Sequence, residues 1–133
     1  VVVDGKTHRQ RVVLVVISNT QLYGGGLVRV APSAYLDDGC LDVYVFRGYG
    51  TAATLHHVLS LLTSLHMRDP QVDYYRAQRV EIYTRKPMPV HTDGDPLGQT
   101  PLYVEAVPQA LKVLVPPTAP AALFQKPALV SVP

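Results

Sequence analysis

The chain has 133 residues, of which 47% are hydrophobic and 17% are charged, and its formal net charge is +2. Such a chain is long enough for one domain with its own core, and without a block of like charges it gives no reason to expect nucleic-acid binding. The single cysteine, Cys40, excludes an internal disulfide and fits a reducing cytoplasm, and no apolar run approaches the roughly 18 residues of a membrane-spanning helix.

The first part of the chain has the pattern of a series of strands. It starts inside an apolar run, Val1–Val3, without an initiator methionine, so we expect a piece of a longer protein whose other part shares the functional site. Residues 11–18 are nearly all β-branched and predict a strand buried on both faces. The three glycines at 24–26 are interpreted as a bulge or a close backbone contact, because no Lys-Ser/Thr follows them as in a phosphate-binding loop. Strand patterns resume at 27–30, and residues 40–46 alternate as a strand does.

One helix is predicted, over residues 51–67, and Thr51 or Thr54 is expected to cap its first turn. Its apolar residues at helical spacing are Leu55, Val58, Leu59, Leu62 and Leu65. The helix also carries histidines, which are interpreted as a solvated polar face because no Glu accompanies them as a metal ligand: His56, His57 and His66.

Strand patterns return after this helix, at residues 79–84, 89–92, 102–107 and 110–115. Many short strands around one helix favour a mostly β fold, an antiparallel sandwich or barrel, over a doubly wound sheet. From residue 116 onward the chain is rich in Pro and Ala. We therefore expect residues 116–133 to form a tail that is poorly ordered or packs on another domain.

Two acidic turns are the candidate functional features. The first places Asp37, Asp38 and Asp42 around a glycine, which suits either a hard cation or a solvated turn, and spacing alone favours the turn. The second, Asp93-Gly94-Asp95, suits either a general base or a hairpin turn, and spacing alone favours the hairpin. Cys40 is interpreted as a buried thiol, since no histidine or second cysteine lies near it in the sequence.

Several short motifs together resemble a known family, the bacterial soluble diacylglycerol kinases or YegS-type lipid kinases, with sphingosine kinases as more distant relatives. The motifs follow in order: Ile17-Ser18-Asn19, Tyr23-Gly24-Gly25-Gly26, Ala31-Pro32-Ser33-Ala34, Asp38-Gly39-Cys40-Leu41-Asp42-Val43, Asp93-Gly94-Asp95 and Val107-Pro108-Gln109-Ala110-Leu111-Lys112-Val113. Each motif is weak alone, and the series is specific for the C-terminal domain of that family.

The resemblance implies a fold and an activity for residues 1–115. The family's C-terminal domain is a β-sandwich, similar also to that of NAD kinases. Its N-terminal α/β domain carries Gly-Gly-Asp-Gly-Thr, which holds the nucleotide phosphates and is absent from this sequence. The implied reaction is transfer of the γ-phosphoryl group of ATP to a lipid hydroxyl such as that of diacylglycerol, in the cytoplasm at the membrane surface. The chain alone is expected to be inactive, and its expected partners are the N-terminal domain and the lipid.

The resemblance also implies roles for individual residues. A structural Mg²⁺ is expected on the Asp38 carboxylate and the backbone carbonyls of Tyr35 and Cys40. Asp95 takes the position of the family's general base, where the family has Glu. Because Asp is shorter by one methylene, about 1.5 Å of reach, the substrate must lie closer or the base must act through a water molecule.

Two other functions remain open at this point. The chain could be a non-enzymatic β-sandwich that binds a lipid or a protein, with acidic turns that are only structural. It could also belong to a kinase of another small hydroxyl compound, because the fold alone does not fix the substrate. A Gly-Gly-Asp-Gly-Thr stretch upstream would decide for the lipid kinase, and a homodimer is left open as a further partnership.

Overall fold

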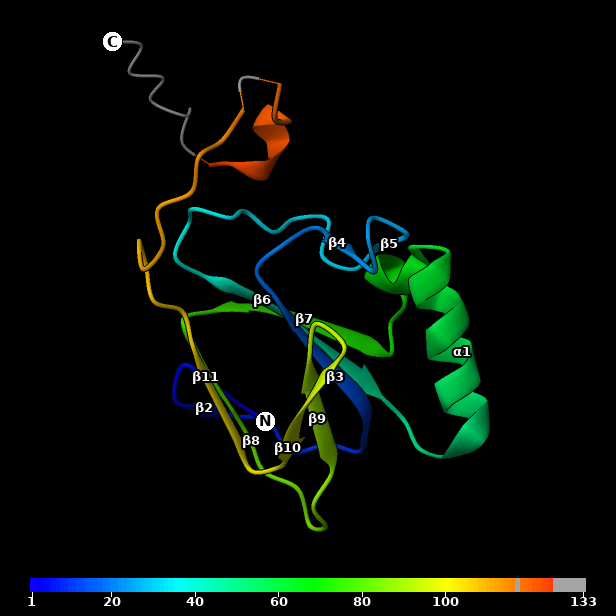
Figure 1. Ribbon diagram of the computed structural model, residues 1–133. Coiled ribbons are helices and arrows are strands. Elements are labelled where there is room, and N and C mark those ends of the chain that lie inside the picture. Colours follow the sequence, from blue (N-terminus) through cyan, green and yellow to red (C-terminus); the bar gives the residue numbers. More distant parts are fainter. Residues whose placement is uncertain (117, 126–133) are drawn as a thin grey trace, which may run out of the picture.

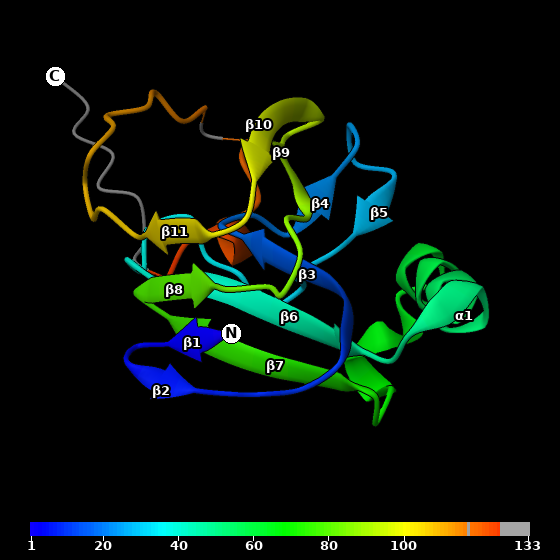
Figure 2. The same ribbon diagram turned by 90° about the horizontal axis from the view of Figure 1, so that it is seen from below.

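The fold consists of two antiparallel sheets packed face to face in a computed structural model that describes residues 1–116 and 118–125 (Figures 1 and 2). One sheet has the order β11-β8-β1-β2, formed by β1 (Val2–Val3), β2 (Lys6–Thr7), β8 (Arg79–Ile82) and β11 (Leu102–Glu105). The other has the order β3-β6-β7, formed by β3 (Val12–Ser18), β6 (Leu41–Arg47) and β7 (Val72–Ala77). The predicted mostly β antiparallel sandwich is confirmed.

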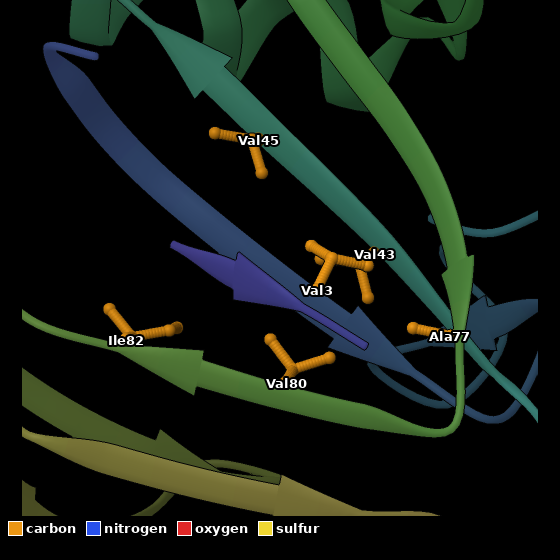
Figure 3. Close-up of a cluster of buried hydrophobic side chains, with 6 residues drawn as sticks. All are labelled: Val3, Val43, Val45, Ala77, Val80 and Ile82. Atoms are coloured by element: carbon orange, nitrogen blue, oxygen red, sulfur yellow. The ribbon is translucent and has the colours of Figure 1, made fainter. Parts of the chain in front are cut away.

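The core between the sheets is built on β6. Val43 and Val45 are fully buried and pack with Val3 and Val80 of the facing sheet, as Figure 3 shows. Because successive strand residues point to opposite faces, the residues between them point away from this core. Phe46 accordingly lies in a second cluster on the far side of the sheet.

Burial differs from the sequence expectation in β3 and β6, because β6 is the central strand and β3 is an edge strand of the same sheet. All of residues 41–46 are buried, although the sequence pattern over 40–46 predicts the alternation of a strand with one exposed face. The prediction that residues 11–18 are buried on both faces is wrong. The residues of β3 are half-buried, and Leu14 is exposed.

The predicted helix is present as α1 (Gly50–Leu62), followed by the short 3-10 helix η1 (Leu65–Arg68). The cap prediction is wrong, because the N-cap residue is Tyr49 and it makes no side-chain cap hydrogen bond. Thr54 lies within the helix, where its hydroxyl donates to the Gly50 carbonyl at 3.0 Å. Gly50 has a φ of +78°, a conformation that suits glycine and fixes where the helix begins.

The helix buries two polar side chains and exposes most of its apolar ones, although Leu61 packs against the core. Its buried residues are His57 and Ser60. The exposed apolar residues of α1 are Leu55, Val58, Leu59 and Leu62. A solvated position is therefore wrong for His57 and for His66 of η1, which are 1% and 0% exposed. Each satisfies one ring nitrogen with a backbone carbonyl, at 2.8 Å for His57 with Arg47 and 2.9 Å for His66 with Val30.

Two hairpins complete the described strands. The first pairs β4 (Leu22–Tyr23) with β5 (Val28–Arg29). Its exposed glycines 24–26 have positive φ, and a Cβ atom added at any of them would meet nothing within 4 Å. These glycines therefore serve the turn conformation, and the interpretation as a bulge or close contact is wrong. The second hairpin pairs β9 (Pro89–Thr92) with β10 (Asp95–Gln99).

The C-terminal part of the chain returns to the loop before β6. The predicted strand at 110–115 is not formed. Further on, the 3-10 helix η2 (Ala121–Leu123) accepts a hydrogen bond at its Leu123 carbonyl from the Leu36 N–H at 2.9 Å. Of the predicted tail 116–133, residues 117 and 126–133 lie outside the described part. Among the described residues, no helix is long and apolar enough to cross a membrane.

Candidate functional site

Asp38 anchors the acidic loop that leads into β6. Its Oδ1 accepts the Cys40 N–H at 2.8 Å, and its Oδ2 accepts from the Arg76 guanidinium at 2.6 Å. The carboxylate is 0% exposed, so the ion pair with Arg76 neutralises a buried charge. The hydrogen bond and ion pair raise the pKa of Arg76 further above its usual value. Asp38 is thus held rigidly in a turn rather than solvated.

Asp42 lies on the same face of the sheet as Arg76, its direct partner across the strands. Its Oδ1 accepts the Tyr74 hydroxyl at 2.7 Å, whereas its Oδ2 is buried without a hydrogen-bond partner. Burial raises the pKa of the Asp42 carboxyl, and the negative charge of Asp38 raises it further. Burial and the Asp42 charge also raise the pKa of Tyr44 to about 12. The start of β6 therefore holds a buried carboxylate oxygen that lacks a hydrogen-bond partner.

Two members of this cluster were not found from the sequence, because β7 was not predicted. Tyr74 and Arg76 both lie on that strand, which pairs with β6 along its length. The aromatic pair Tyr74-Tyr75 in a β-prone run is the signal that could have revealed it. The partnership of Arg76 with Asp38 joins residues 38 positions apart and has no local signature.

The second acidic turn forms a tight hairpin loop between β9 and β10. Asp93 and Gly94 have φ values of +50° and +98°, as the two central residues of a type I′ turn require. Asp95 is the first residue of β10, lies opposite Thr92, and is exposed. The predicted hairpin turn is confirmed, and it holds the Asp95 carboxylate in solvent at the start of a strand.

The two acidic turns are not linked by a hydrogen bond or an ion pair in the described part of the chain. Within residues 1–116 and 118–125, no hydrogen bond or ion pair links Asp95 to Asp38 or Asp42. His91 lies on β9 opposite Pro96 and is exposed. Two assignments therefore stay predictions. One is Asp95 as the general base, and the other is a metal site formed by Tyr35, Asp38 and Cys40.

We predict that Gly39→Ala destabilises the acidic loop more than Gly25→Ala destabilises the β4–β5 turn. Both glycines have a φ near +70°, at +70° and +69°, so the cost of a left-handed conformation is shared. Only at Gly39 would the new Cβ meet another residue, Pro108 Cγ at 3.1 Å. Thermal or urea unfolding should show that Gly25→Ala lowers the free energy of unfolding by about 1 kcal/mol and that Gly39→Ala lowers it by more. Equal losses for the two variants would mean that Pro108 moves away from the new Cβ atom without a cost in stability.

The fold and the two turns define a class of protein, an antiparallel β-sandwich domain with a rigid acidic loop and an exposed carboxylate on a hairpin. A family model described as the YegS C-terminal NAD kinase beta sandwich-like domain matches residues 1–115. The chain belongs to this family, and the resemblance found in its motifs is confirmed.

Relatives of this chain carry kinase names. A "Probable lipid kinase YegS-like" from Shewanella frigidimarina is 26% identical over 88% of this chain, and a diacylglycerol kinase from Mycobacterium tuberculosis is 33% identical over 74%. A solved structure of a candidate diacylglycerol kinase from Bacillus anthracis str. Sterne is 25% identical over 80% of this chain, with a TM-score of 0.63. The chain spans only 37%, 31% and 34% of the lengths of these proteins, respectively.

Proposed function

We propose that this chain is the C-terminal domain of an ATP-dependent lipid kinase that phosphorylates a lipid hydroxyl such as that of diacylglycerol. The observation that carries the proposal is the family match over residues 1–115, together with relatives named as lipid or diacylglycerol kinases. Since the chain covers only about a third of the length of these relatives, the nucleotide is proposed to bind mainly to a separate N-terminal domain of the full-length protein.

Asp95 is the proposed general base. Phosphoryl transfer depends on positioning, charge neutralisation and a carboxylate that orients the attacking hydroxyl. Asp95 is exposed at the start of β10, and in the described part of the chain its carboxylate is not engaged by an ion pair or hydrogen bond. In the proposed step it accepts the hydroxyl proton while the lipid oxygen bonds to the γ-phosphorus. The bond from that phosphorus to the bridging oxygen breaks, and ADP leaves.

A lipid substrate is supported by the outer face of α1. Leu55, Leu59 and Leu62 are more than half exposed, at 61%, 54% and 61%. An exposed apolar helix face is suited to contact with acyl chains or with the surface of a bilayer. We therefore propose that the full-length kinase acts at the cytoplasmic membrane surface.

The acidic loop is proposed to hold a structural Mg²⁺ on the Asp38 carboxylate and the Tyr35 and Cys40 carbonyls. The residues fit a hard cation: a carboxylate offers about four lone-pair sites, Asp38 uses two, and the buried Asp42 Oδ2 has no partner. When bound, the ion would neutralise these oxygens and fix the loop. Arg76 would then share the Asp38 carboxylate with it.

We predict that Mg²⁺ raises the melting temperature of the full-length protein, and that Asp38→Ala removes this increase. The variant also loses its bonds to Arg76 and Cys40, so its melting temperature without Mg²⁺ is lower. The readout is therefore the Mg²⁺-dependent increment, measured by differential scanning calorimetry. Equal increments in both proteins would refute the assignment of Asp38 to the ion.

The activity is tested by incubating the full-length protein with labelled ATP and a panel of lipids and small hydroxyl compounds. Phosphorylation of a lipid supports the proposal, and phosphorylation of a non-lipid alone would indicate a different kinase. A folded full-length protein that binds lipid vesicles without transferring phosphate would favour a non-enzymatic binding domain. The 133-residue chain alone should show no turnover, and measurable turnover would contradict the two-domain account.

A further inference from the structure

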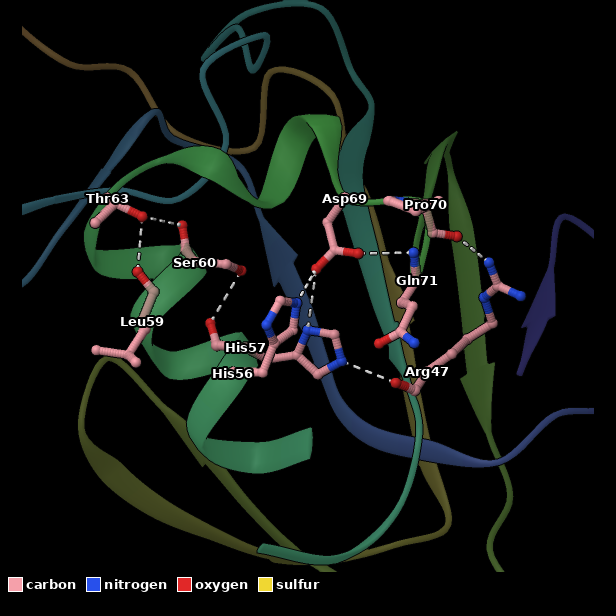
Figure 4. Close-up of polar contacts among 9 residues, drawn as sticks. All are labelled: Arg47, His56, His57, Leu59, Ser60, Thr63, Asp69, Pro70 and Gln71. Atoms are coloured by element: carbon pink, nitrogen blue, oxygen red, sulfur yellow. Dashed lines mark hydrogen bonds and ion pairs between the residues drawn. The ribbon is translucent and has the colours of Figure 1, made fainter. Parts of the chain in front are cut away.

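A group of three metal-binding side chains lies apart from both acidic turns. Within residues 1–116 and 118–125, His56 and His57 of α1 and Asp69 after η1 are brought together, with one ligand atom from each within 4.8 Å of the others. His56 Nε2 is 2.7 Å from Asp69 Oδ2, and His57 Nδ1 is 3.6 Å from the same oxygen. Figure 4 shows both rings turned toward this carboxylate.

The ring of His57 is the informative member. It is 1% exposed, and its Nε2 lies 2.8 Å from the Arg47 carbonyl, which can only accept a hydrogen bond. Nε2 therefore carries the hydrogen, and in the neutral ring Nδ1 presents a lone pair. This buried Nδ1 has no hydrogen-bond partner and faces the Asp69 carboxylate, so two electron-rich atoms oppose each other. A cation placed between them would pair both atoms.

The ligand atoms are held by contacts behind them. Asp69 Oδ1 accepts the Gln71 N–H at 2.8 Å, which leaves Oδ2 directed at the histidines. The Arg47 carbonyl fixes the tautomer of His57 in the same way. Backing of this kind is typical of metal ligands.

The separations suit a small divalent ion. Metal–ligand bonds of about 2.0–2.1 Å at a tetrahedral angle place two ligand atoms about 3.3 Å apart. The 3.6 Å between His57 Nδ1 and Asp69 Oδ2 is close to that value. The 2.7 Å between His56 Nε2 and Asp69 Oδ2 is a hydrogen-bond distance, which would lengthen when the ion replaces the shared hydrogen. The His56 side chain is 56% exposed and lines a groove of about 610 Å³ with Leu59, Thr63 and Arg68, so water can complete the coordination.

We propose that His56 Nε2, His57 Nδ1 and Asp69 Oδ2 bind a borderline divalent transition-metal ion of the Zn²⁺ class, which ties α1 to the turn that leads into β7. Two imidazoles and one carboxylate select such an ion over Mg²⁺ or Ca²⁺, which prefer oxygen ligands alone. The site is independent of the proposed kinase activity, because it shares no residue with the acidic loop or with the Asp95 hairpin.

The test is binding of Zn²⁺ to the full-length protein in excess Mg²⁺, measured by competition with a chromophoric chelator. Wild type should bind one equivalent of Zn²⁺. The affinity for Zn²⁺ should fall by about 100-fold or more in His56→Gln and in Asp69→Asn. The matched control is His91→Gln, another exposed histidine, which should retain wild-type affinity. His57 is left unchanged because its ring packs against Phe46 at 5.2 Å and its loss would disturb the core.

Two further readouts separate a built site from surface binding. Zn²⁺ should raise the melting temperature of wild type and not that of His56→Gln. Co²⁺ should give the visible absorption bands of a site with low coordination number in wild type, and in neither His56→Gln nor Asp69→Asn. Circular dichroism checks that the variants fold. The proposal is overturned if wild type binds no Zn²⁺ at micromolar concentration, if either ligand variant keeps wild-type affinity, or if His91→Gln weakens binding equally.

Discussion

Asp95→Asn is expected to lower kcat of the full-length protein in the proposed kinase reaction by about 10²–10⁴-fold, the usual contribution of a general base. The substitution keeps the size and shape of the side chain and removes its capacity to take a proton. Because Asp95 is exposed at the start of β10, the free energy of unfolding should change by no more than about 0.5 kcal/mol. Steady-state kinetics with ATP and the preferred lipid, beside a urea unfolding curve, measures both quantities.

Asp93→Asn is the matched control for this experiment. Asp93 has a φ of +50°, a conformation that asparagine tolerates as well as aspartate, so the turn should keep its shape. Its kcat should stay near that of wild type. If Asp93→Asn abolishes turnover and Asp95→Asn does not, the two roles are reversed. If neither substitution changes kcat, this turn does not supply the base.

Phe46→Ala is expected to lower the free energy of unfolding by about 3–5 kcal/mol, which approaches the whole stability of a small domain. Phe46 is 0% exposed and lies in the cluster with Ala31, Ala34 and Tyr44 on the outer face of the β3-β6-β7 sheet. Its ring also packs edge-on against His57 at 5.2 Å. Removing it leaves a cavity beneath α1 that small neighbours cannot fill. Chemical denaturation of the chain, followed by circular dichroism, measures the loss.

Phe46→Leu and Tyr49→Ala complete the series. Leucine refills part of the cavity, so Phe46→Leu should lose less than Phe46→Ala and stay folded if the alanine variant does not. Tyr49 is 75% exposed and contacts the Arg11 guanidinium at 5.3 Å, so its removal should cost about 1 kcal/mol or less. A Phe46→Ala protein as stable as Tyr49→Ala would show that this cluster does not support the fold.

The sequence by itself determined the features that depend on neighbours along the chain. The apolar spacing after Gly50 specified a helix, and Asp93-Gly94 specified a two-residue turn, because both depend on local φ/ψ preferences. The ordered series of motifs identified the family over residues 1–115. Many short strands with one helix were enough to predict the sandwich.

The tertiary structure alone decided which side chains meet. Arg76 reaches Asp38 because β7 pairs with β6 in one register, and a slip of one residue would turn Arg76 to the other face. The burial of His57 depends on how α1 packs against the sheet, and Asp69 reaches it only after the chain reverses through η1. The helical period of the sequence did not predict the burial of His57, since it marks a face as apolar or polar without saying which face meets the core. Contacts between distant residues are set by strand register and packing, which no local pattern encodes.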